Sequence, residues 1–354
     1  MPPQKRTPTE TPRRIVDLRS DTVTVPTRQM LEAMISAPVG DDVFGEDPTA
    51  NRLQAMVAKM CAKEAALFVS SGTMGNLLSI KALTQPGDEI ILEANSHAYH
   101  WETGGYAALA NVAARLIKAD RGIIQPEQLP PAIRPRGIHH TRSSLVVLEN
   151  THNRGGGSVY PVETVEAIAR VCRQHQLRLH MDGARIFDAC VAAGCDVADY
   201  TRHVDSVTFC LSKSLGCPVG SMIAGDREFI ETARWLRHMF GGAMRQVGYL
   251  AAAGIYALEH NIQRLAEDHD SARRLADGIR GMAGLRLVYD PPETNMVYFE
   301  VLPPGSPAEL QARVRKDGLL VGGPEGNPVR AVTHMGITRA DIDYAVSVLR
   351  AHCG

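Results

Sequence analysis

The chain has 354 residues, of which 44% are hydrophobic and 22% are charged, and its formal net charge is −1. This is the composition of an ordinary globular protein, and the balanced charge excludes a whole-chain attraction to nucleic acid. No run approaches the roughly 18 apolar residues that a membrane-spanning helix needs. We therefore expect neither a nucleic-acid nor a membrane partner, and the length favours one large domain with a smaller one.

The N-terminal segment and the cysteines indicate in which cellular compartment the protein is expected. Residues 1–14, MPPQKRTPTETPRR, are rich in proline, threonine and basic residues. They predict a disordered tail, with a transit peptide as the alternative. The seven cysteines are scattered, with no CxxC pair and no zinc-like spacing. Such a set is typical of reduced thiols, so we predict a cytoplasmic protein without a metal site.

Short apolar runs alternate with helical patterns between about residues 50 and 225. The runs lie at 65–71, 89–94, 113–119, 144–150, 177–182, 206–212 and 220–225. Within 163–174, apolar residues repeat at i, i+3, i+4 and i+7 and mark one buried helix face. Strands that alternate with helices predict βαβ units, and so an α/β fold with a largely parallel sheet.

The C-terminal part has a different pattern. A helical stretch rich in alanine spans 246–279 and is long enough to bridge two domains. Four apolar runs follow, LRLVY, NMVYFEV, LLVGG and VRAVTH, and then a final helix from Thr338. These elements predict a smaller α+β domain. We expect a large domain over 15–265 and a small domain over 266–354.

Two charged residues stand at the ends of predicted strands. Lys213 directly follows the run 206–212, among small residues, and Asp182 ends the run before it. Ligands of open α/β sheets bind beyond the carboxyl ends of the strands. In enzymes that use pyridoxal phosphate (PLP), a lysine forms a Schiff base with the cofactor and a carboxylate pairs with the pyridinium nitrogen. The alternative is a chance strand-end acid and a lysine in a salt bridge.

A phosphate site is predicted where the run 65–71 passes into a helix. Gly72 lets the backbone approach an anion, Thr73 can cap the helix, and the free N–H groups of the first turn attract negative charge. The sequence has neither a Walker motif nor GxGxxG, so a nucleotide is the less favoured phosphate. An ordinary strand–helix junction is the alternative.

Several histidines lie near strand ends. His97 lies just past the run 89–94. A neutral imidazole there can stack on a cofactor ring or act as a base, because its unperturbed pKa is about 6.5. An ordinary loop histidine is the alternative. His139, His140 and His152 flank the run 144–150, and one of them is a further candidate, whereas we interpret His100 as structural.

Two arginines suit a carboxylate ligand. Arg185 lies three residues after Asp182, and Arg330 lies within an apolar run, where a lone guanidinium needs an anionic partner. Guanidinium groups bind carboxylates bidentately, which suits an amino-acid substrate. A structural salt bridge is the alternative for each.

Together, the motifs resemble those of the low-specificity L-threonine aldolases, in the same order from about residue 15 to the terminal helix. They are DLRSDTVTVPT (17–27), GDDVFGEDPT (40–49), SSGTMGN, LENTHN, HMDGARIF, LSKSLGCPVGS and GGAMRQ (241–246). The resemblance implies PLP fold type I, with a mostly parallel seven-stranded sheet flanked by helices and a smaller C-terminal α+β domain. It also implies reversible cleavage of L-threonine, L-allo-threonine and related β-hydroxy-α-amino acids to glycine and an aldehyde.

The resemblance also implies residue roles. Lys213 would hold PLP, Asp182 would pair with the pyridine nitrogen, and His97 would stack on the ring. The cofactor-binding set would be completed by Gly72 and Thr73 at the phosphate, Arg185, and Arg245 reaching a neighbouring subunit's cofactor. The substrate carboxylate would be held by Ser20, Arg185 and Arg330. His97 and His139 would be candidates for contact with the β-hydroxyl, in a homotetramer built from dimers.

Some positions depart from the family pattern. His238 stands where many members carry lysine, Ala243 stands where a third glycine is common, and the loop NRGGGSVYP is longer than in the shorter bacterial sequences. These departures bear on side-chain specificity and not on the Schiff-base chemistry. One alternative is another PLP lyase or β-eliminating enzyme of the same fold. The other is a non-catalytic binding subunit, which should have lost Lys213 or Asp182.

Overall fold

A large, mostly parallel sheet organises the chain. The structure, a computed structural model, describes residues 15–322 and 328–354, so the predicted tail at 1–14 lies outside the described residues. The strand order is β2-β8-β7-β6-β5-β3-β4, and β8 runs antiparallel to both of its neighbours. Each predicted run forms one strand: β2 (Ala65–Val69), β3 (Glu89–Glu93), β4 (Ala113–Ile117), β5 (Ser143–Glu149), β6 (Arg178–Asp182), β7 (Ser206–Cys210) and β8 (Ser221–Gly225). The predicted α/β fold with a mostly parallel seven-stranded sheet is confirmed.

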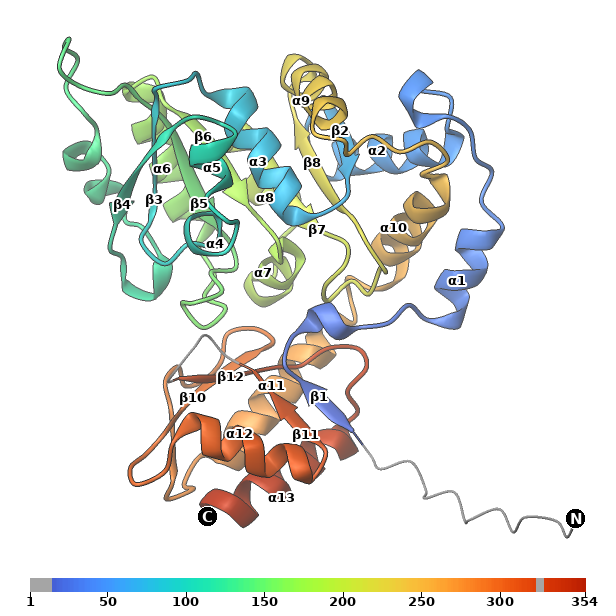
Figure 1. Cartoon of the computed structure of the whole chain (residues 1–354), viewed down its shortest axis with the longest axis vertical. Helices are drawn as coiled ribbons and strands as arrows, with labels where there is room; N and C mark the ends of the chain where they lie inside the picture. The colour runs from blue at the N-terminus through green and yellow to red at the C-terminus, as the bar shows by residue number, and fades with distance from the viewer. Residues whose placement is uncertain (1–14, 323–327) are drawn as a thin grey trace, which may run out of the picture.

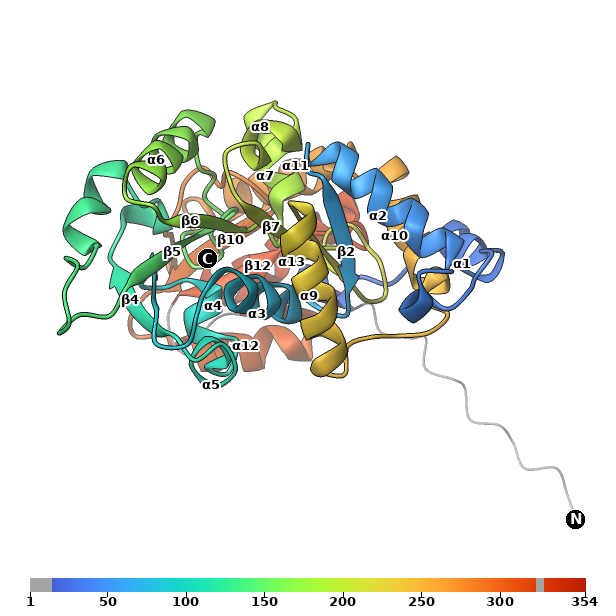
Figure 2. The same ribbon diagram turned by 90° about the horizontal axis from the view of Figure 1, so that it is seen from above.

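Helices cover both faces of this sheet (Figure 2). One face is covered by α3 (Gly72–Leu83) and α9 (Arg227–Met239), and the other by α6 (Val162–Gln174), α7 (Ile186–Ala193) and α8 (Val197–Thr201). The apolar repeat predicted in 163–174 is the buried face of α6, since its four apolar residues are all buried. Sheet strands buried on both faces read as continuous apolar runs, which is why the sequence pattern located them.

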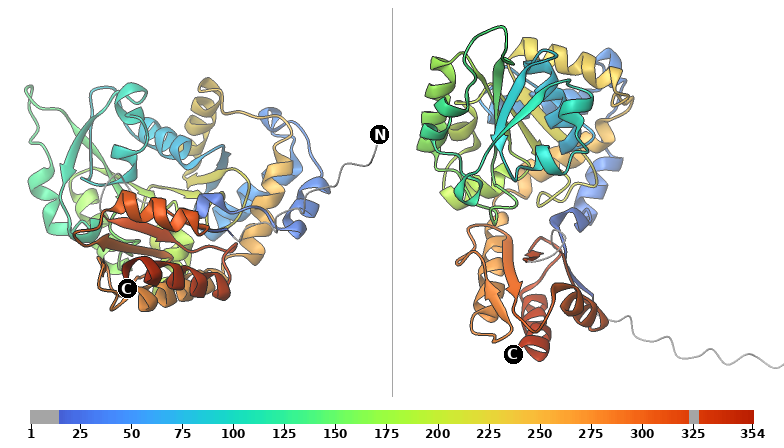
Figure 3. Two further views of the ribbon diagram at one scale, coloured as in Figure 1. Left: turned by 60° about the horizontal axis from the view of Figure 1, so that its bottom comes forward. Right: turned by 60° about the vertical axis from the view of Figure 1, so that its left-hand side comes forward.

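A second unit with its own core lies at one edge of the sheet (Figures 1 and 3). Its antiparallel sheet has the order β12-β10-β9, and β1 pairs in parallel with β11. The elements are β1 (Val16–Leu18), β9 (Leu285–Leu287), β10 (Met296–Val301), α12 (Pro307–Lys316), β11 (Leu319–Val321), β12 (Val329–Val332) and α13 (Arg339–Cys353). Val16 and Leu18 are fully buried in this core, so the N-terminal strand packs with the C-terminal elements.

The helical stretch predicted over 246–279 is divided into two helices, α10 (Gly248–His260) and α11 (Leu265–Ile279). At the break, the Asn261 side-chain amide donates to the Leu215 carbonyl oxygen at 2.7 Å. The first helix contributes to the core of the large sheet and the second to the core of the second unit. The break therefore lies where the chain passes between the two cores.

The remaining helices complete the surface of the large sheet. They are α1 (Arg28–Ile35), α2 (Pro48–Met60), α4 (His97–His100) and α5 (Gly105–Ala108). None of the helices in 15–322 and 328–354 combines the length and apolar composition that a membrane crossing requires. The parallel strands end at the edge of the sheet that faces the second unit (Figure 1).

Candidate active site

A cavity of about 370 Å³ opens at this edge, between the large sheet and the second unit. It brings together five of the residues predicted from sequence: Ser20, His97, Arg185, Lys213 and Arg330. The other lining residues are Thr22, Trp101, Asn153, Arg154 and Tyr298. The lining comes from chain segments far apart in the sequence, and Tyr298 and Arg330 belong to the second unit.

Lys213 follows β7 in a tight turn that explains its small neighbours. The Gly216 N–H donates to the Lys213 carbonyl oxygen at 2.8 Å, and Gly216 has a φ of +81°. A Cβ at Gly216 would lie 2.5 Å from the sulfur of Met335, so no larger side chain fits. Among the described residues, no hydrogen bond or ion pair engages the Lys213 Nζ. Lys213 is half-buried, and its amine has no partner in the described part of the chain.

Asp182 ends β6 as a buried carboxylate held by an amide. The Asn76 Nδ2 donates to Asp182 Oδ2 at 2.8 Å, and the Ala184 N–H donates to Oδ1 at 3.1 Å. His180 in turn hydrogen-bonds to Asn76 Oδ1 at 3.2 Å, and burial lowers the pKa of this imidazole to about 4. A neutral His180 leaves the negative charge of Asp182 uncompensated from that side.

His97 begins α4 and is held at two points. Its backbone N–H donates to Glu149 Oε2 at 2.6 Å, and its Nδ1 hydrogen-bonds to Glu102 Oε1 at 2.9 Å. Burial alone would lower the pKa of His97, but the hydrogen bond to Glu102 and the charges of Asp182 and Glu149 raise it. Glu102 also accepts from Asn76, so the histidine and Asp182 share one hydrogen-bond network.

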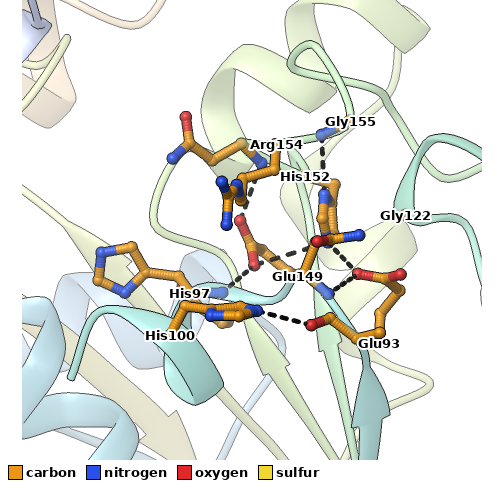
Figure 4. Close-up of polar contacts among 12 residues, drawn as sticks. Glu93, His97, His100, Gly122, Glu149, His152, Arg154 and Gly155 are labelled. Carbon is orange, nitrogen blue, oxygen red and sulfur yellow. Dashed lines mark hydrogen bonds and ion pairs between the residues drawn. The ribbon is translucent and has the colours of Figure 1, made fainter. Parts of the chain in front are cut away.

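A second network lies behind His97 (Figure 4). His152, 1% exposed, lies between Glu93 and Glu149, with its Nε2 at 3.1 Å from Glu93 Oε2 and 3.8 Å from Glu149 Oε2. Burial alone would lower the pKa of His152, but the charges of the two carboxylates raise it. The other oxygen of Glu149 accepts from the Asn153 N–H at 2.8 Å. Glu149 thus joins the backbones of two cavity residues, His97 and Asn153.

The two predicted arginines have different partners. Arg185 is fully buried and binds Asp21 bidentately, with Nε and Nη2 at 2.6 and 2.7 Å from the two carboxylate oxygens. Arg330 donates to Asn153 Oδ1 at 2.7 Å and to the Arg19 carbonyl oxygen at 3.1 Å. Its Nε is buried without a partner. Arg330 therefore keeps its full charge and a spare donor for an anion.

The predicted phosphate site lies at the start of α3. The helix begins at Gly72, and its cap is Ser71, which accepts from the Met74 N–H at 3.1 Å. The cap predicted at Thr73 is wrong, because Thr73 already lies within the first turn. A Cβ at Gly72 would lie 2.7 Å from the Cys210 sulfur, so the helix start packs directly against the sheet. Gly72 and Thr73 do not line the cavity.

Asp182 is also absent from the cavity lining, and two further predicted residues lie away from the cavity within one chain. His139 is exposed on the loop before β5. Arg245 pairs with Asp41 at 2.9 Å and lies over the ring of Phe44, 5.9 Å from its centroid. Neither residue is among those that line the cavity.

Sequence reasoning missed the other five lining residues, which are Thr22, Trp101, Asn153, Arg154 and Tyr298. Three of them had a usable signal, because Trp101 follows His97 within the same short segment, and Asn153 and Arg154 follow directly after β5. Tyr298 had none, since only the packing of the second unit brings β10 to the sheet edge. The carboxylates Glu102 and Glu149 were also missed, although Glu149 is the last residue of a predicted strand.

Curated relatives match almost the whole chain. The "Probable low-specificity L-threonine aldolase 2" of Arabidopsis thaliana is 44% identical over 96% of this chain and 97% of its own length. The "Low specificity L-threonine aldolase" of Escherichia coli (strain K12) is 43% identical over 95% of this chain and 99% of its own length. The chain belongs to this family. The model of the broader family described as "Beta-eliminating lyase" matches residues 17–302 of this threonine aldolase family member.

Solved structures agree with this assignment at the level of the fold. A threonine aldolase of Leishmania major superposes with a TM-score of 0.82 at 21% identity, covering 95% of this chain and 99% of the other. A "putative aromatic amino acid beta-eliminating lyase/threonine aldolase" from Exiguobacterium sp. 255-15 gives a TM-score of 0.79 at 20% identity, covering 92% and 94%. The predicted fold type is confirmed.

PLP is the cofactor of this threonine aldolase family, and the residues of the site fit it. Lys213 offers an amine without a partner in the described chain, and Asp182 offers a buried carboxylate. Beside the start of α3, the hydroxyls of Thr208 and Ser221 are buried without hydrogen-bond partners. A Cβ at Gly75 would lie 2.6 Å from the Thr208 side chain, so the first turns of α3 pack closely against β7 here. Unpaired buried hydroxyls at a helix start suit a phosphate.

Proposed function

We propose that this chain cleaves L-threonine, L-allo-threonine and related β-hydroxy-α-amino acids to glycine and an aldehyde, and catalyses the reverse condensation. One observation supports this most strongly: a free lysine amine, a histidine and three guanidinium groups line a single cavity. The amine suits a carbonyl cofactor, the guanidinium groups suit an α-carboxylate, and the imidazole suits a hydroxyl proton. The names of the relatives agree with this reaction.

The residues that would hold PLP come from four strand ends. Lys213 would bind the cofactor through its amine, Asp182 would pair with the ring nitrogen, and His97 would pack on the ring. Gly72 and Thr73 would contact the phosphate at the start of α3, and Arg185 would lie beside the cofactor. When bound, PLP withdraws electrons from the substrate's Cα, which allows the Cα–Cβ bond to break.

The remaining residues would position the substrate and move its proton. Arg330, Arg185 and Ser20 would fix the α-carboxylate, and such positioning can contribute about 7–11 kcal/mol to lowering the barrier. His97 would take the β-hydroxyl proton, and His139 is the second candidate for that contact. A general base typically adds about 10²–10⁴-fold to the rate. The raised pKa of His97 makes it a stronger base once it is deprotonated.

We further propose a homotetramer built from dimers, working in the cytoplasm. Arg245 would reach the cofactor of a neighbouring subunit, and its position beside the exposed ring of Phe44 supports a role at a subunit contact. Seven free thiols support a reducing compartment. The domain boundaries at 265 and 266 remain a prediction.

Product analysis tests the reaction. Purified protein saturated with PLP is incubated with L-threonine, and we expect equal amounts of glycine and acetaldehyde. The "Beta-eliminating lyase" family description favours one rival, elimination of the β-hydroxyl, which would give 2-oxobutanoate and ammonia from the same substrate. Formation of those products without glycine would overturn the proposal.

The Lys213→Ala variant tests the central residue. We expect it to lose both turnover and the visible absorbance of covalently held cofactor, because the only amine of the cavity is removed. Lys81→Ala, which removes a lysine bonded to the Leu109 carbonyl on the outside of α3, serves as the matched control. A Lys213→Ala protein that kept the absorbance and the turnover would contradict the assignment.

A further inference from the structure

Arg154 points to a binding function beyond the α-carboxylate. It lines the cavity, and its guanidinium carbon lies 5.5 Å from the ring centroid of Trp101. In residues 15–322 and 328–354, no carboxylate forms an ion pair with it. Arginine is always charged, and a charged side chain that faces a cavity without a counter-ion is a binding site for an anion.

The cavity has more positive charge than its own residues neutralise, and Arg154 carries the excess. None of the lining residues is acidic, and three of them are arginines. Asp21 neutralises Arg185 through two short hydrogen bonds. Arg330 has only uncharged oxygens as partners and is available to one carboxylate. A substrate with a single carboxylate therefore leaves Arg154 without an anion.

The backbone that carries Arg154 is held in place. The Gly155 N–H donates to His152 Nδ1 at 3.0 Å, and the Tyr289 hydroxyl donates to the Arg154 carbonyl oxygen at 3.1 Å. The preceding residue, Asn153, accepts from Arg330. Arg154 is thus the chain neighbour of the residue that binds Arg330, and Figure 4 shows Arg154 in the same cluster of polar residues as Glu149 and His97.

The cofactor does not account for this positive charge. Its phosphate is assigned to Gly72 and Thr73, which do not line the cavity, and Lys213 and Asp182 meet its other groups. The Trp101 ring is 48% exposed, and the Arg154 guanidinium stacks over it. This contact leaves the N–H donors of Arg154 free for an anion. Arg154 is therefore directed at the substrate end of the cavity.

We propose that Arg154, supported by Trp101, binds a second anionic group on the substrate, carried by the carbon chain beyond Cβ. The group is a carboxylate or a phosphate, since guanidinium binds both bidentately. The preferred substrates are then β-hydroxy-α-amino acids with an acidic side chain, and the matching aldehydes carry an acid group. This inference rests on the proposed function, because Arg330 is assigned to the α-carboxylate.

The test measures binding to the PLP-loaded protein by calorimetry. The probes are butyrate, succinate and 3-phosphonopropionate, which share one carboxylate and differ in a second anionic group. We expect at least one of the two dianions to bind about tenfold or more tightly than butyrate, the size expected for a hydrogen bond to a charged group. Preference for succinate indicates a carboxylate ligand, and preference for 3-phosphonopropionate indicates a phosphate ligand.

Two variants separate direct binding from loop distortion. Arg154→Gln should bring the ratio of dianion to butyrate affinity close to one. Arg121→Gln is the matched control, because Arg121 donates to the Gly155 carbonyl oxygen at 3.4 Å but lies outside the cavity lining. It should keep the wild-type ratio. A wild-type protein without preference, or an Arg154→Gln variant that keeps it, would overturn the inference.

The binding assay needs no turnover, so the two proposals fail separately. If threonine gives no glycine but the dianion preference depends on Arg154, the proposed reaction is overturned and the anion site stands. If threonine is cleaved but no dianion is preferred, the anion site is overturned and the reaction stands.

Discussion

At the residue scale, the site consists of reactive groups whose orientation is set by buried partners. His97 illustrates this, since Glu102 holds its ring and Glu149 holds its backbone. Arg185 is oriented in the same way by Asp21, whose pKa is held low by the adjacent guanidinium despite its burial. A buried charge with a bidentate partner is held in one orientation, so its remaining donors point in a fixed direction toward a ligand.

Glu102 should set the pH dependence of the reaction. A base acts when it is deprotonated, so the raised pKa of His97 places the acidic limb of the rate profile above the range of an ordinary histidine. In Glu102→Gln the hydrogen bond to a charged oxygen is gone while burial remains, so the pKa of His97 falls and the acidic limb moves to lower pH. We would measure kcat for threonine against pH and the His97 ring titration by NMR in the cofactor-free protein.

Glu259→Gln, in which an exposed carboxylate bonded to Arg52 is removed far from His97, is the control for this experiment. An unchanged acidic limb in Glu102→Gln, together with an unchanged His97 titration, would show that Glu102 does not control this histidine.

The candidate site residues at the sheet edge were predictable from the sequence, and their hydrogen-bond partners were not. Lys213, His97 and Asp182 stand at or just after apolar runs, and parallel strands bring such positions to one edge. Glu102, Asn76 and Asp21 act through contacts that only the folded chain creates, as Asp21 meets Arg185 across 164 residues of sequence. The sequence around such a carboxylate does not indicate which distant cationic side chain will pair with it in the folded protein.

At the element scale, neighbouring strands β3 and β5 place two carboxylates around one imidazole. Glu93 and Glu149 are the last residues of these paired strands, and His152 from the following loop lies between them. The Nε2 of His152 faces both carboxylates and offsets part of the cost of burying two negative charges at one sheet edge, while its Nδ1 accepts from the Gly155 N–H. The same loop continues into Asn153 and Arg154, so this cluster supports one wall of the cavity.

Replacing His152 should destabilise the protein. His152→Leu removes the ring nitrogen that faces the two buried carboxylates, and breaking a buried pair costs about 3–5 kcal/mol of unfolding free energy. Because the pKa of His152 is raised in the folded state, its stabilisation is complete below about pH 6.5 and is lost as the pH rises through the folded-state pKa. The difference between variant and wild type should therefore be largest at mildly acidic pH.

Urea unfolding at several pH values measures this effect. His100→Leu is the matched control, since His100 is exposed and bonds only to the Ala94 carbonyl oxygen. A His152→Leu variant as stable as His100→Leu at pH 6 would contradict the ionic role of the cluster.

Strands were easier to predict from the sequence than helix ends. The buried strands read as unbroken apolar runs because both faces are covered, and each was found. The pattern over 246–279 looks continuous because alanine and leucine repeat throughout, but the helix is broken at Asn261–Arg264, where three of the four residues are polar. Only the bond from Asn261 to the Leu215 carbonyl shows why the chain turns there.

At the scale of the whole molecule, several large apolar side chains of the described residues are exposed to solvent. They come from the segment 25–44 and from α9 and α10, and α1 lies beside α10 in Figure 1. The members are Val25, Leu31, Ile35, Phe44, Trp235, Met239 and Tyr249. Ile35 is 78% exposed and Phe44 is 72% exposed, although both side chains are large and apolar. Exposed apolar patches mark contacts with other proteins.

The proposed homotetramer predicts that charges placed here will break a subunit contact. We expect the wild-type protein to have a tetramer's mass by light scattering, and the double variant Ile35→Asp/Phe44→Asp to have a smaller mass. Ile15→Asp, at a residue 67% exposed in the second unit, is the control and should keep the wild-type mass. A monomeric wild type, or a double variant of unchanged mass, would contradict the prediction.

The pairing of β1 with β11 has a consequence for how the enzyme is made. Ser20 and Thr22 follow β1 directly and line the cavity, yet β1 has no neighbouring strand until residues 319–321 exist. During synthesis from the N-terminus, β1 therefore remains unpaired while later segments of the chain form the large sheet. The catalytic cavity closes only when nearly the whole polypeptide has left the ribosome, so a chain cut short before β11 has most of its core but no finished active site.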